Sequence, residues 1–210
     1  MTAKDEQYAR QAPDWTERAY ADVASYLEHR AELIAKLGGK LAPGDEVLDL
    51  ACGDAGLGEA LVRRGLRYRG VDSTPEMVDA ARRRLGARAE IDLGDLNDYV
   101  PPDPVAATTV FRAIYYARDR TAFFRHVSGF TDKKLVFDLN PRQYRVEDVV
   151  ADLKVAGLAS VELHPFFFPQ RHRLPRPFAA ALRAAERSGP FARALLRVRF
   201  SYLVSASRTG

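Results

Sequence analysis

Residues 47–56 read Val47-Leu48-Asp49-Leu50-Ala51-Cys52-Gly53-Asp54-Ala55-Gly56, and the rest of the chain is organised around them. The apolar start predicts a short strand, and the small residues after it predict a turn that opens a helix over 57–64. A turn of this kind lets backbone N–H groups approach a ligand closely, and the helix start adds a partial positive charge. In α/β proteins, nucleotide-like ligands bind at such units.

The composition is that of one globular domain. The chain has 210 residues, of which 47% are hydrophobic and 29% charged, so it can bury a substantial core. No apolar run approaches the roughly 20 residues that span a bilayer, and the polar N-terminus predicts no signal peptide. Cys52 is the one cysteine, which rules out an internal disulfide and predicts a reducing, cytoplasmic location.

The net charge of +4 hides an uneven distribution. Residues 169–210 hold nine arginines and one acid, a balance of +8, so the remaining residues sum to −4. This basic segment suggests an anionic partner such as an acidic substrate, a membrane surface or nucleic acid. A solvated arginine-rich face explains it equally well, since the chain has 26 arginines and only 6 lysines.

From residue 46 onward, the pattern alternates between strands and helices. An amphipathic helical segment over 14–37 precedes it. Strands are expected at 46–50, 68–71, 88–91, 106–111, 134–138, 160–168 and 196–206. Helices are expected at 57–64, 75–85, 121–127 and 146–156, with two short ones beginning at Pro177 and Pro190. Such alternation implies a largely parallel sheet covered on both faces.

Three aspartates recur at intervals of 23 residues, at or just after the ends of the first three strands: Asp49, Asp72 and Asp95. Because parallel strands end at one edge of the sheet, the three are expected to face one crevice. Asp72 can accept hydrogen bonds from both hydroxyls of a ribose, and Asp95 from the amine of an adenine. Asp49 can face a cationic group, and Met77 can pack on the adenine. Helix capping alone also places acids at such junctions, but three in register favour a nucleoside site.

These segments resemble the motifs of the class I S-adenosylmethionine-dependent methyltransferases, over about residues 15–168. Residues 46–54 resemble the acid and glycine-rich turn of the first motif, 70–77 the ribose-binding second motif, and 92–96 the adenine-contacting third. The resemblance implies S-adenosylmethionine as cofactor and S-adenosylhomocysteine as product. The cofactor-binding residues expected from the motifs and their surroundings are Tyr20, Asp49, Ala51, Cys52, Gly53, Asp72, Ser73, Met77, Asp95, Leu96 and Arg112.

The resemblance also implies the architecture. It predicts a doubly wound α/β fold with a mostly parallel seven-stranded sheet, in the order 3-2-1-4-5-7-6 with the last strand antiparallel. Within a single domain over 1–210, residues 14–37 form an N-terminal helical cap and 46–168 the Rossmann-like core. Residues 169–195 form a basic helical insertion or lid before the last strand, 196–206.

The turn departs from the family at two positions, because Ala51 and Ala55 stand where glycine is usual. Ala55 disfavours the left-handed backbone region, so we expect Gly56 to take that role in a locally shifted turn. The main alternative fold assignment is a nicotinamide-dependent dehydrogenase. Its Gly-x-Gly-x-x-Gly fingerprint does not fit the spacing of Gly53, Gly56 and Gly58.

The acceptor side is expected in the loops after the fourth and fifth strands and in the lid segment. His172 is the best-placed general base, with Tyr115 and Tyr116 as further catalytic candidates, whereas His29 is expected on a helix surface. Core packing accounts equally well for the aromatic candidates. No metal ligands are expected. The expected acceptor-binding residues are Tyr115, Tyr116, Arg142, Tyr144, Phe168 and His172.

Three functions remain open at this stage. The leading one is O- or C-methylation of a small molecule, such as a phenolic, isoprenoid or polyketide-like compound that can be anionic. The second is RNA methylation with the basic segment as a phosphate clamp, although the motifs of base-methylating enzymes are missing. The third is a cofactor-binding protein of the same fold without catalysis.

Overall fold

The computed structural model describes residues 12–173, 175–189, 192, 194, 196 and 201–208. Seven strands form one sheet in the order β3-β2-β1-β4-β5-β7-β6. Strands β1 to β5 pair in parallel, and β7 is antiparallel to both β5 and β6. The predicted fold class and strand order are confirmed.

The sheet strands are β1 (Glu46–Leu50), β2 (Arg67–Asp72), β3 (Glu90–Leu93), β4 (Val105–Val110), β5 (Thr131–Leu139), β6 (Ser160–Phe166) and β7 (Ser201–Ser207). The α-helices are α2 (Trp15–Ala19), α3 (Val23–Lys36), α4 (Gly56–Val62), α5 (Pro75–Leu85), α6 (Arg120–Ser128), α7 (Val146–Val155) and α8 (Arg176–Glu186). Short 3-10 helices are η1 (Ala12–Asp14), η2 (Gly86–Arg88) and η3 (Ile114–Tyr116).

Two expected strands begin later than predicted. β3 begins at Glu90 because η2 continues the chain after α5. β7 begins at Ser201, whereas Leu196 is helical and packs beside Phe167 and Ala192. An apolar residue at 196 fits a strand or a helix face equally well, so the sequence pattern does not separate the two. The helix expected at Pro190 begins outside the described residues.

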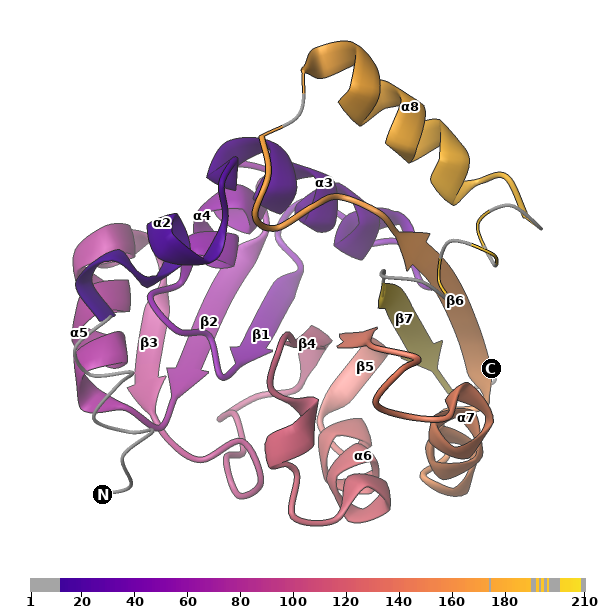
Figure 1. Ribbon diagram of the computed structural model, residues 1–210. Coiled ribbons are helices and arrows are strands. Elements are labelled where there is room, and N and C mark those ends of the chain that lie inside the picture. Colours follow the sequence, from indigo (N-terminus) through magenta and orange to yellow (C-terminus); the bar gives the residue numbers. More distant parts are fainter. Residues whose placement is uncertain are drawn as a thin grey trace.

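Helices cover both faces of the sheet (Figure 1). Helices α3, α4 and α5 lie over one face, where α4 follows the turn after β1 and packs on β2. Helices α6 and α7 cover the other face. Fully buried residues such as Leu48, Leu50, Val136 and Phe137 come from the central strands. Because these strands are buried on both faces, their sequences are continuous apolar runs. The same packing holds the carboxyl ends of β1, β2 and β4 at one edge of the sheet.

Helix α8 lies outside the two helical layers, next to α3 (Figure 1). Its last residue, Glu186, is buried, and its carboxylate accepts a 2.8 Å hydrogen bond from the Phe167 backbone N–H. His29 Nε2 lies 2.7 Å and His164 Nε2 3.7 Å from the same carboxylate. Although burial opposes it, these contacts hold the pKa of Glu186 below its usual range. The surface position predicted for His29 is therefore wrong, since α8 covers it.

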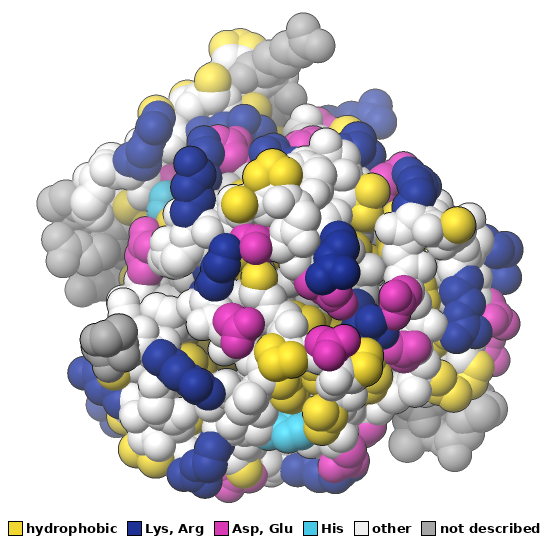
Figure 2. Space-filling view, turned by 180° about the vertical axis from the view of Figure 1, so that it is seen from behind, with side chains coloured by type: hydrophobic (Ala, Val, Ile, Leu, Met, Phe, Trp, Pro, Cys, Tyr) yellow, Lys and Arg dark blue, Asp and Glu magenta, His cyan; other side chains and the backbone are white. Residues whose placement is uncertain are grey.

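The rear face mixes charges of both signs. Figure 2 shows arginine and lysine side chains interspersed with acidic ones across this face, without one continuous basic patch. Within the sheet, Arg69 on β2 pairs with Glu46 on β1 and with Glu90 and Asp92 on β3. Such networks neutralise charge locally and bridge adjacent strands at the amino half of the sheet.

Candidate active site

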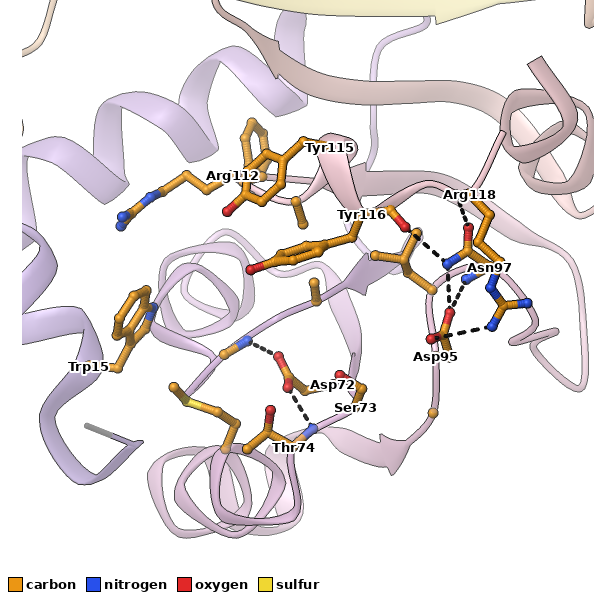
Figure 3. Close-up of a pocket in the computed structure, with 17 residues that line it drawn as sticks. Trp15, Asp72, Ser73, Thr74, Asp95, Asn97, Arg112, Tyr115, Tyr116 and Arg118 are labelled. Atoms are coloured by element: carbon orange, nitrogen blue, oxygen red, sulfur yellow. Dashed lines mark hydrogen bonds and ion pairs between the residues drawn. The ribbon is translucent and has the colours of Figure 1, made fainter. Parts of the chain in front are cut away.

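A cavity of about 510 Å³ opens at the carboxyl edge of the sheet, where the strand order reverses between β1 and β4. This is the position at which open α/β sheets bind ligands. The volume falls within the range of small-molecule sites. Figure 3 shows residues from five segments of the chain around it. The lining residues are Trp15, Ala51, Gly53, Asp72, Ser73, Thr74, Met77, Gly94, Asp95, Leu96, Asn97, Phe111, Arg112, Ala113, Tyr115, Tyr116 and Arg118.

The turn after β1 has three residues in the left-handed backbone region. These are Ala51 (φ 59°), Gly53 (φ 58°) and Ala55 (φ 57°). The expectation that Gly56 takes over from Ala55 is wrong, because Ala55 adopts the positive φ itself and is the N-cap of α4. Gly56 is needed for space instead, since a Cβ there would lie 2.2 Å from Thr16 Oγ1. The turn therefore keeps its shape at a conformational cost in two alanines.

Asp72, at the end of β2, is held by the backbone. One carboxylate oxygen accepts a hydrogen bond from Gly53 N–H and the other from Thr74 N–H, both at 2.9 Å. Burial raises the pKa of Asp72, although these hydrogen bonds oppose the rise. Figure 3 shows the carboxylate between the two turns. Its remaining lone pairs can accept hydrogen bonds from a diol such as a ribose.

The loop after β3 completes this end of the cavity. The Asp95 carboxylate accepts 2.8 Å hydrogen bonds from the backbone and side chain of Asn97, and Arg118 lies 3.7 Å away. These contacts lower the pKa of Asp95 although partial burial opposes them. Met77 and Leu96 are buried and line the cavity beside it. The expected adenine-contacting residues thus lie together at one end of the cavity.

Asp49 faces a second, smaller pocket of about 50 Å³, which shares Trp15, Ala51 and Phe111 with the large cavity. Its carboxylate accepts hydrogen bonds from Thr109 Oγ1 at 2.6 Å and Tyr68 Oη at 2.8 Å. Burial raises the pKa of Asp49 to about 6. The three aspartates therefore face two adjoining pockets rather than the single crevice expected from their spacing.

Arg30 was missed by the sequence analysis and also lines the small pocket. It is 2% exposed, and its guanidinium lies 4.2 Å from the Phe111 ring and 4.8 Å from the Tyr26 ring. Its Nη2 donates to Tyr26 Oη, whereas its Nε has no hydrogen-bond partner. Tyr20 stacks on Tyr26 in the pocket wall. The signal in the sequence was an arginine among the mostly apolar buried residues of α3.

Cys52 lines the small pocket as well. Burial and neighbouring carboxylates raise the pKa of its thiol well above the usual range. A thiol held protonated is a poor nucleophile. The contribution of Cys52 to the site is therefore its backbone, whose N–H donates to Val71 O at 2.9 Å.

Arg112 follows β4 and has an unusual backbone. Its φ is 55°, and its N–H donates a 2.7 Å hydrogen bond to the Asp138 carboxylate at the end of β5. The guanidinium carbon lies 5.2 Å from the centre of the Trp15 ring. Its Nη1 is buried without a hydrogen-bond partner. Arg112 therefore brings an uncommitted hydrogen-bond donor to the cavity.

Tyr115 and Tyr116 lie at the mouth of the cavity on η3. Their rings are 4.4 Å apart, and the residues are 46% and 37% exposed. Figure 3 shows both side chains pointing into the cavity, with Trp15 on its opposite side. Exposed aromatic rings around a cavity are suited to packing against a flat or apolar ligand.

The other acceptor-side candidates do not line either pocket. Phe168 is buried in the core, with its ring edge against Tyr26 at 6.1 Å. Tyr144 packs under the guanidinium of Arg120 at 5.5 Å. Arg142 and His172 are exposed on the surface. The geometry favours Tyr115 and Tyr116 over these four, because η3 follows β4 directly at the edge where the cavity opens.

Hydrogen bonds and packing hold helix α2 over the turn after β1. The residues that make these contacts are not among the site residues expected from the sequence. Asp54 accepts hydrogen bonds from the backbone N–H and the hydroxyl of Thr16, and from Arg84 at 2.7 Å. Trp15 packs against Gly53, where a Cβ would lie 3.1 Å from its ring. These contacts hold the tryptophan over the cavity.

Within the described part of the chain, no helix is long and apolar enough to cross a membrane. The same residues contain no group of three or more histidine, cysteine, aspartate or glutamate side chains that could hold a metal ion.

Comparisons with known proteins agree with this geometry. Residues 47–133 match the sequence profile of a family described as "Methyltransferase domain". An uncharacterised methyltransferase of Schizosaccharomyces pombe is 37% identical over 81 residues, which are 39% of this chain. The aligned part is 30% of the yeast protein, so this chain corresponds to less than a third of its length.

Solved structures share the fold over nearly the whole chain. One is magnesium protoporphyrin IX methyltransferase from Synechocystis with bound S-adenosylmethionine, at 15% identity and a TM-score of 0.61, covering 100% of this chain and 86% of that one. Another is a TehB-like S-adenosylmethionine-dependent methyltransferase from Corynebacterium glutamicum, at 18% identity and a TM-score of 0.64, covering 99% of each chain. Residues 47–133 therefore form a methyltransferase domain, and the chain has the class I fold of S-adenosylmethionine-dependent methyltransferases that its three motifs predicted.

Proposed function

We propose that the protein transfers a methyl group from S-adenosylmethionine to an oxygen or carbon atom of a small-molecule acceptor. The observation that carries this proposal is the cavity of about 510 Å³, which has the backbone-held Asp72 at one end and aromatic rings at its mouth. A cytoplasmic location stays a prediction from the cysteine content.

The residues present fit the cofactor. Asp72 suits the ribose, while Met77, Asp95 and Leu96 suit the adenine. The small pocket is lined by an anionic group, the Asp49 carboxylate, and a cationic group, the Arg30 guanidinium. Ala51 lines both this pocket and the large cavity. An ammonium and a carboxylate on one carbon, as at the amino-acid end of the cofactor, complement this pair.

When bound, the cofactor supplies a methyl group on a sulfonium that an acceptor atom displaces directly. The chain then acts mainly by position. Trp15 on one side and Tyr115 and Tyr116 on the other hold the acceptor in line and exclude water. An acceptor that carries a proton also needs a base, and the phenols of the two tyrosines are nearer candidates than the exposed His172.

Calorimetric titration with S-adenosylmethionine tests the proposal. Asp72→Ala removes two charge-assisted hydrogen bonds to a diol, so we expect the affinity to fall about 100-fold. The control is Asp79→Ala, which removes an exposed acid of α5. Circular dichroism of each variant checks the fold. Absence of binding to the wild-type protein, or equal binding by Asp72→Ala, contradicts the cofactor assignment.

RNA as the acceptor has one observation in its favour, the exposed arginines Arg171, Arg173 and Arg187 near α8. Phosphate binding by such residues weakens steeply with salt. Filter binding to RNA between 50 and 200 mM salt therefore decides between the two acceptors. Affinity that is undetectable or independent of salt excludes the phosphate clamp.

A further inference from the structure

We infer that the acceptor carries a carboxylate and that Arg112 is the residue that selects it. The inference rests on the proposed function and narrows its substrate class to flat or aromatic acids. The alternative is that Arg112 binds the carboxylate of the cofactor, since the sequence analysis places Arg112 among the cofactor-binding residues.

The cofactor carboxylate already has a place in the small pocket. Asp49 and Arg30 both line it, so the pocket offers one group to each charge of an amino-acid end. Arg30 is fixed among aromatic rings and keeps an unpartnered Nε. If the amino-acid end of the cofactor binds there, its ammonium pairs with Asp49 and its carboxylate with Arg30. Arg112 remains for a different anion.

Arg112 differs from the other arginine on the large cavity. Arg118 pairs with Asp98 at 2.9 Å and lies 3.7 Å from Asp95. Among the described residues, no acid forms an ion pair with the Arg112 guanidinium, and its Nη1 is buried without a partner. A buried donor left without a partner is costly, and native proteins satisfy nearly all such groups. A ligand carboxylate supplies the missing acceptor and the missing charge.

The backbone keeps Arg112 in this place. A non-glycine residue at φ 55° is conformationally strained, and the hydrogen bond from Arg112 N–H to Asp138 holds it there. Asp138 thus binds the backbone and leaves the guanidinium free. Figure 3 shows the guanidinium extended along the cavity on the side of Trp15.

The side chains around Arg112 indicate what the rest of the acceptor should look like. Arg112 lines the cavity together with Trp15 on one side and Tyr115 and Tyr116 on the other (Figure 3). The exposed rings of the two tyrosines provide apolar surface at the mouth. An acid on a flat ring can pack on this surface while its carboxylate reaches Arg112.

The test measures acid binding to protein loaded with S-adenosylhomocysteine. The probes are 4-hydroxycinnamate, benzoate and 3-phenylpropionate, each paired with its primary amide, titrated by calorimetry. We expect at least one acid to bind tenfold or more tightly than its amide. Arg112→Gln should reduce this ratio below about twofold and Arg112→Lys should retain part of it. The affinity for S-adenosylhomocysteine should stay within about threefold in both variants.

Arg125→Gln is the matched control, because it removes the same charge from the exposed surface of α6. It should leave the acid-to-amide ratio unchanged. Equal binding of acids and amides, or no measurable acid binding to the loaded wild-type protein, overturns the inference. A tenfold loss of S-adenosylhomocysteine affinity in Arg112→Gln overturns it too, since Arg112 then holds the cofactor. If the wild-type protein binds no S-adenosylhomocysteine, the proposed function itself fails and the inference falls with it.

Discussion

The two sides of the cavity are built differently. On the side proposed to bind the cofactor, the Asp72 carboxylate is held by two backbone N–H groups, and Asp95 by its own loop. On the acceptor side, Tyr115 and Tyr116 are exposed and Arg112 keeps an unpartnered nitrogen. The first side is preorganised by the backbone, and the second presents exposed rings and a guanidinium nitrogen that a ligand can contact.

This difference teaches where specificity resides. A ligand of fixed structure binds more tightly to groups whose positions are set before binding, because less conformational entropy is lost on association. Side chains on η3 can change without disturbing the sheet, so the acceptor can change while the fold stays the same. Substitutions on the cofactor side should therefore affect stability and affinity together. Those on the acceptor side should affect acceptor binding alone.

The largest effect on stability is expected from Gly58→Ala, which tests how tightly the side proposed for the cofactor is packed. A Cβ at Gly58 would lie 2.6 Å from two carbons of the buried Tyr68 ring. Tyr68 holds Asp49 through its hydroxyl, so the ring cannot move freely. Overpacking should outweigh the gain in helix propensity and lower the free energy of unfolding by about 2 kcal/mol.

Urea denaturation of both proteins measures this change. Gly39→Ala is the control, because a Cβ there would make only ordinary contacts at 3.4 Å or more. If packing causes the effect, the free energy of unfolding of Gly39→Ala should differ little from that of the wild type. Equal stability of Gly58→Ala and the wild type would show that the region under Asp49 is looser than the contacts indicate.

The second prediction concerns pH. Burial raises the pKa of Asp49 to about 6, and only the ionised form can pair with an ammonium. Affinity for S-adenosylmethionine should therefore fall about tenfold between pH 7 and pH 5, as Asp49 becomes protonated. The effect on folding has the opposite sign, because a raised pKa makes the free energy of unfolding decrease as pH rises through 6.

Asp49→Asn isolates this contribution from that of Asp72, whose pKa burial also raises. The variant should bind weakly at pH 7 and lose most of the pH dependence in calorimetric titrations. Unchanged affinity of the wild type from pH 7 to pH 5 would show that Asp49 does not meet the cofactor ammonium.

The sequence predicted the fold and the residues that line one end of the cavity, because both depend on local patterns. Asp72 is positioned by its own strand end and by the turn that begins at Ala51. The 23-residue repeat that brought Asp95 to the same edge is visible in one chain. The exception is Asp49, which faces the small pocket, because the sequence spacing of the aspartates does not distinguish two adjoining pockets at one edge of the sheet.

The contacts between distant segments could not be predicted. Arg30 reaches the small pocket only because α3 packs in one core cluster with residues of β1 and β4, which brings its guanidinium over Phe111. The same holds for Glu186, which meets His29 across 157 residues. Phe168 illustrates the reverse error, because an aromatic triplet at a strand end fits a ligand wall and a buried core alike.

The smallest predicted effect concerns the two alanines of the turn, which separate backbone strain from packing. Ala51→Gly relieves the left-handed conformation at a half-buried position, so it should raise the free energy of unfolding by about 0.5–1 kcal/mol. Ala55→Gly relieves the same strain but removes a fully buried methyl group worth about 0.8 kcal/mol, so the two changes nearly cancel. Thermal unfolding of both variants measures the difference. Greater stabilisation by Ala55→Gly would mean that strain at position 55 dominates. If Ala51→Gly also weakens cofactor binding, the strained alanine is part of what keeps the cofactor side rigid.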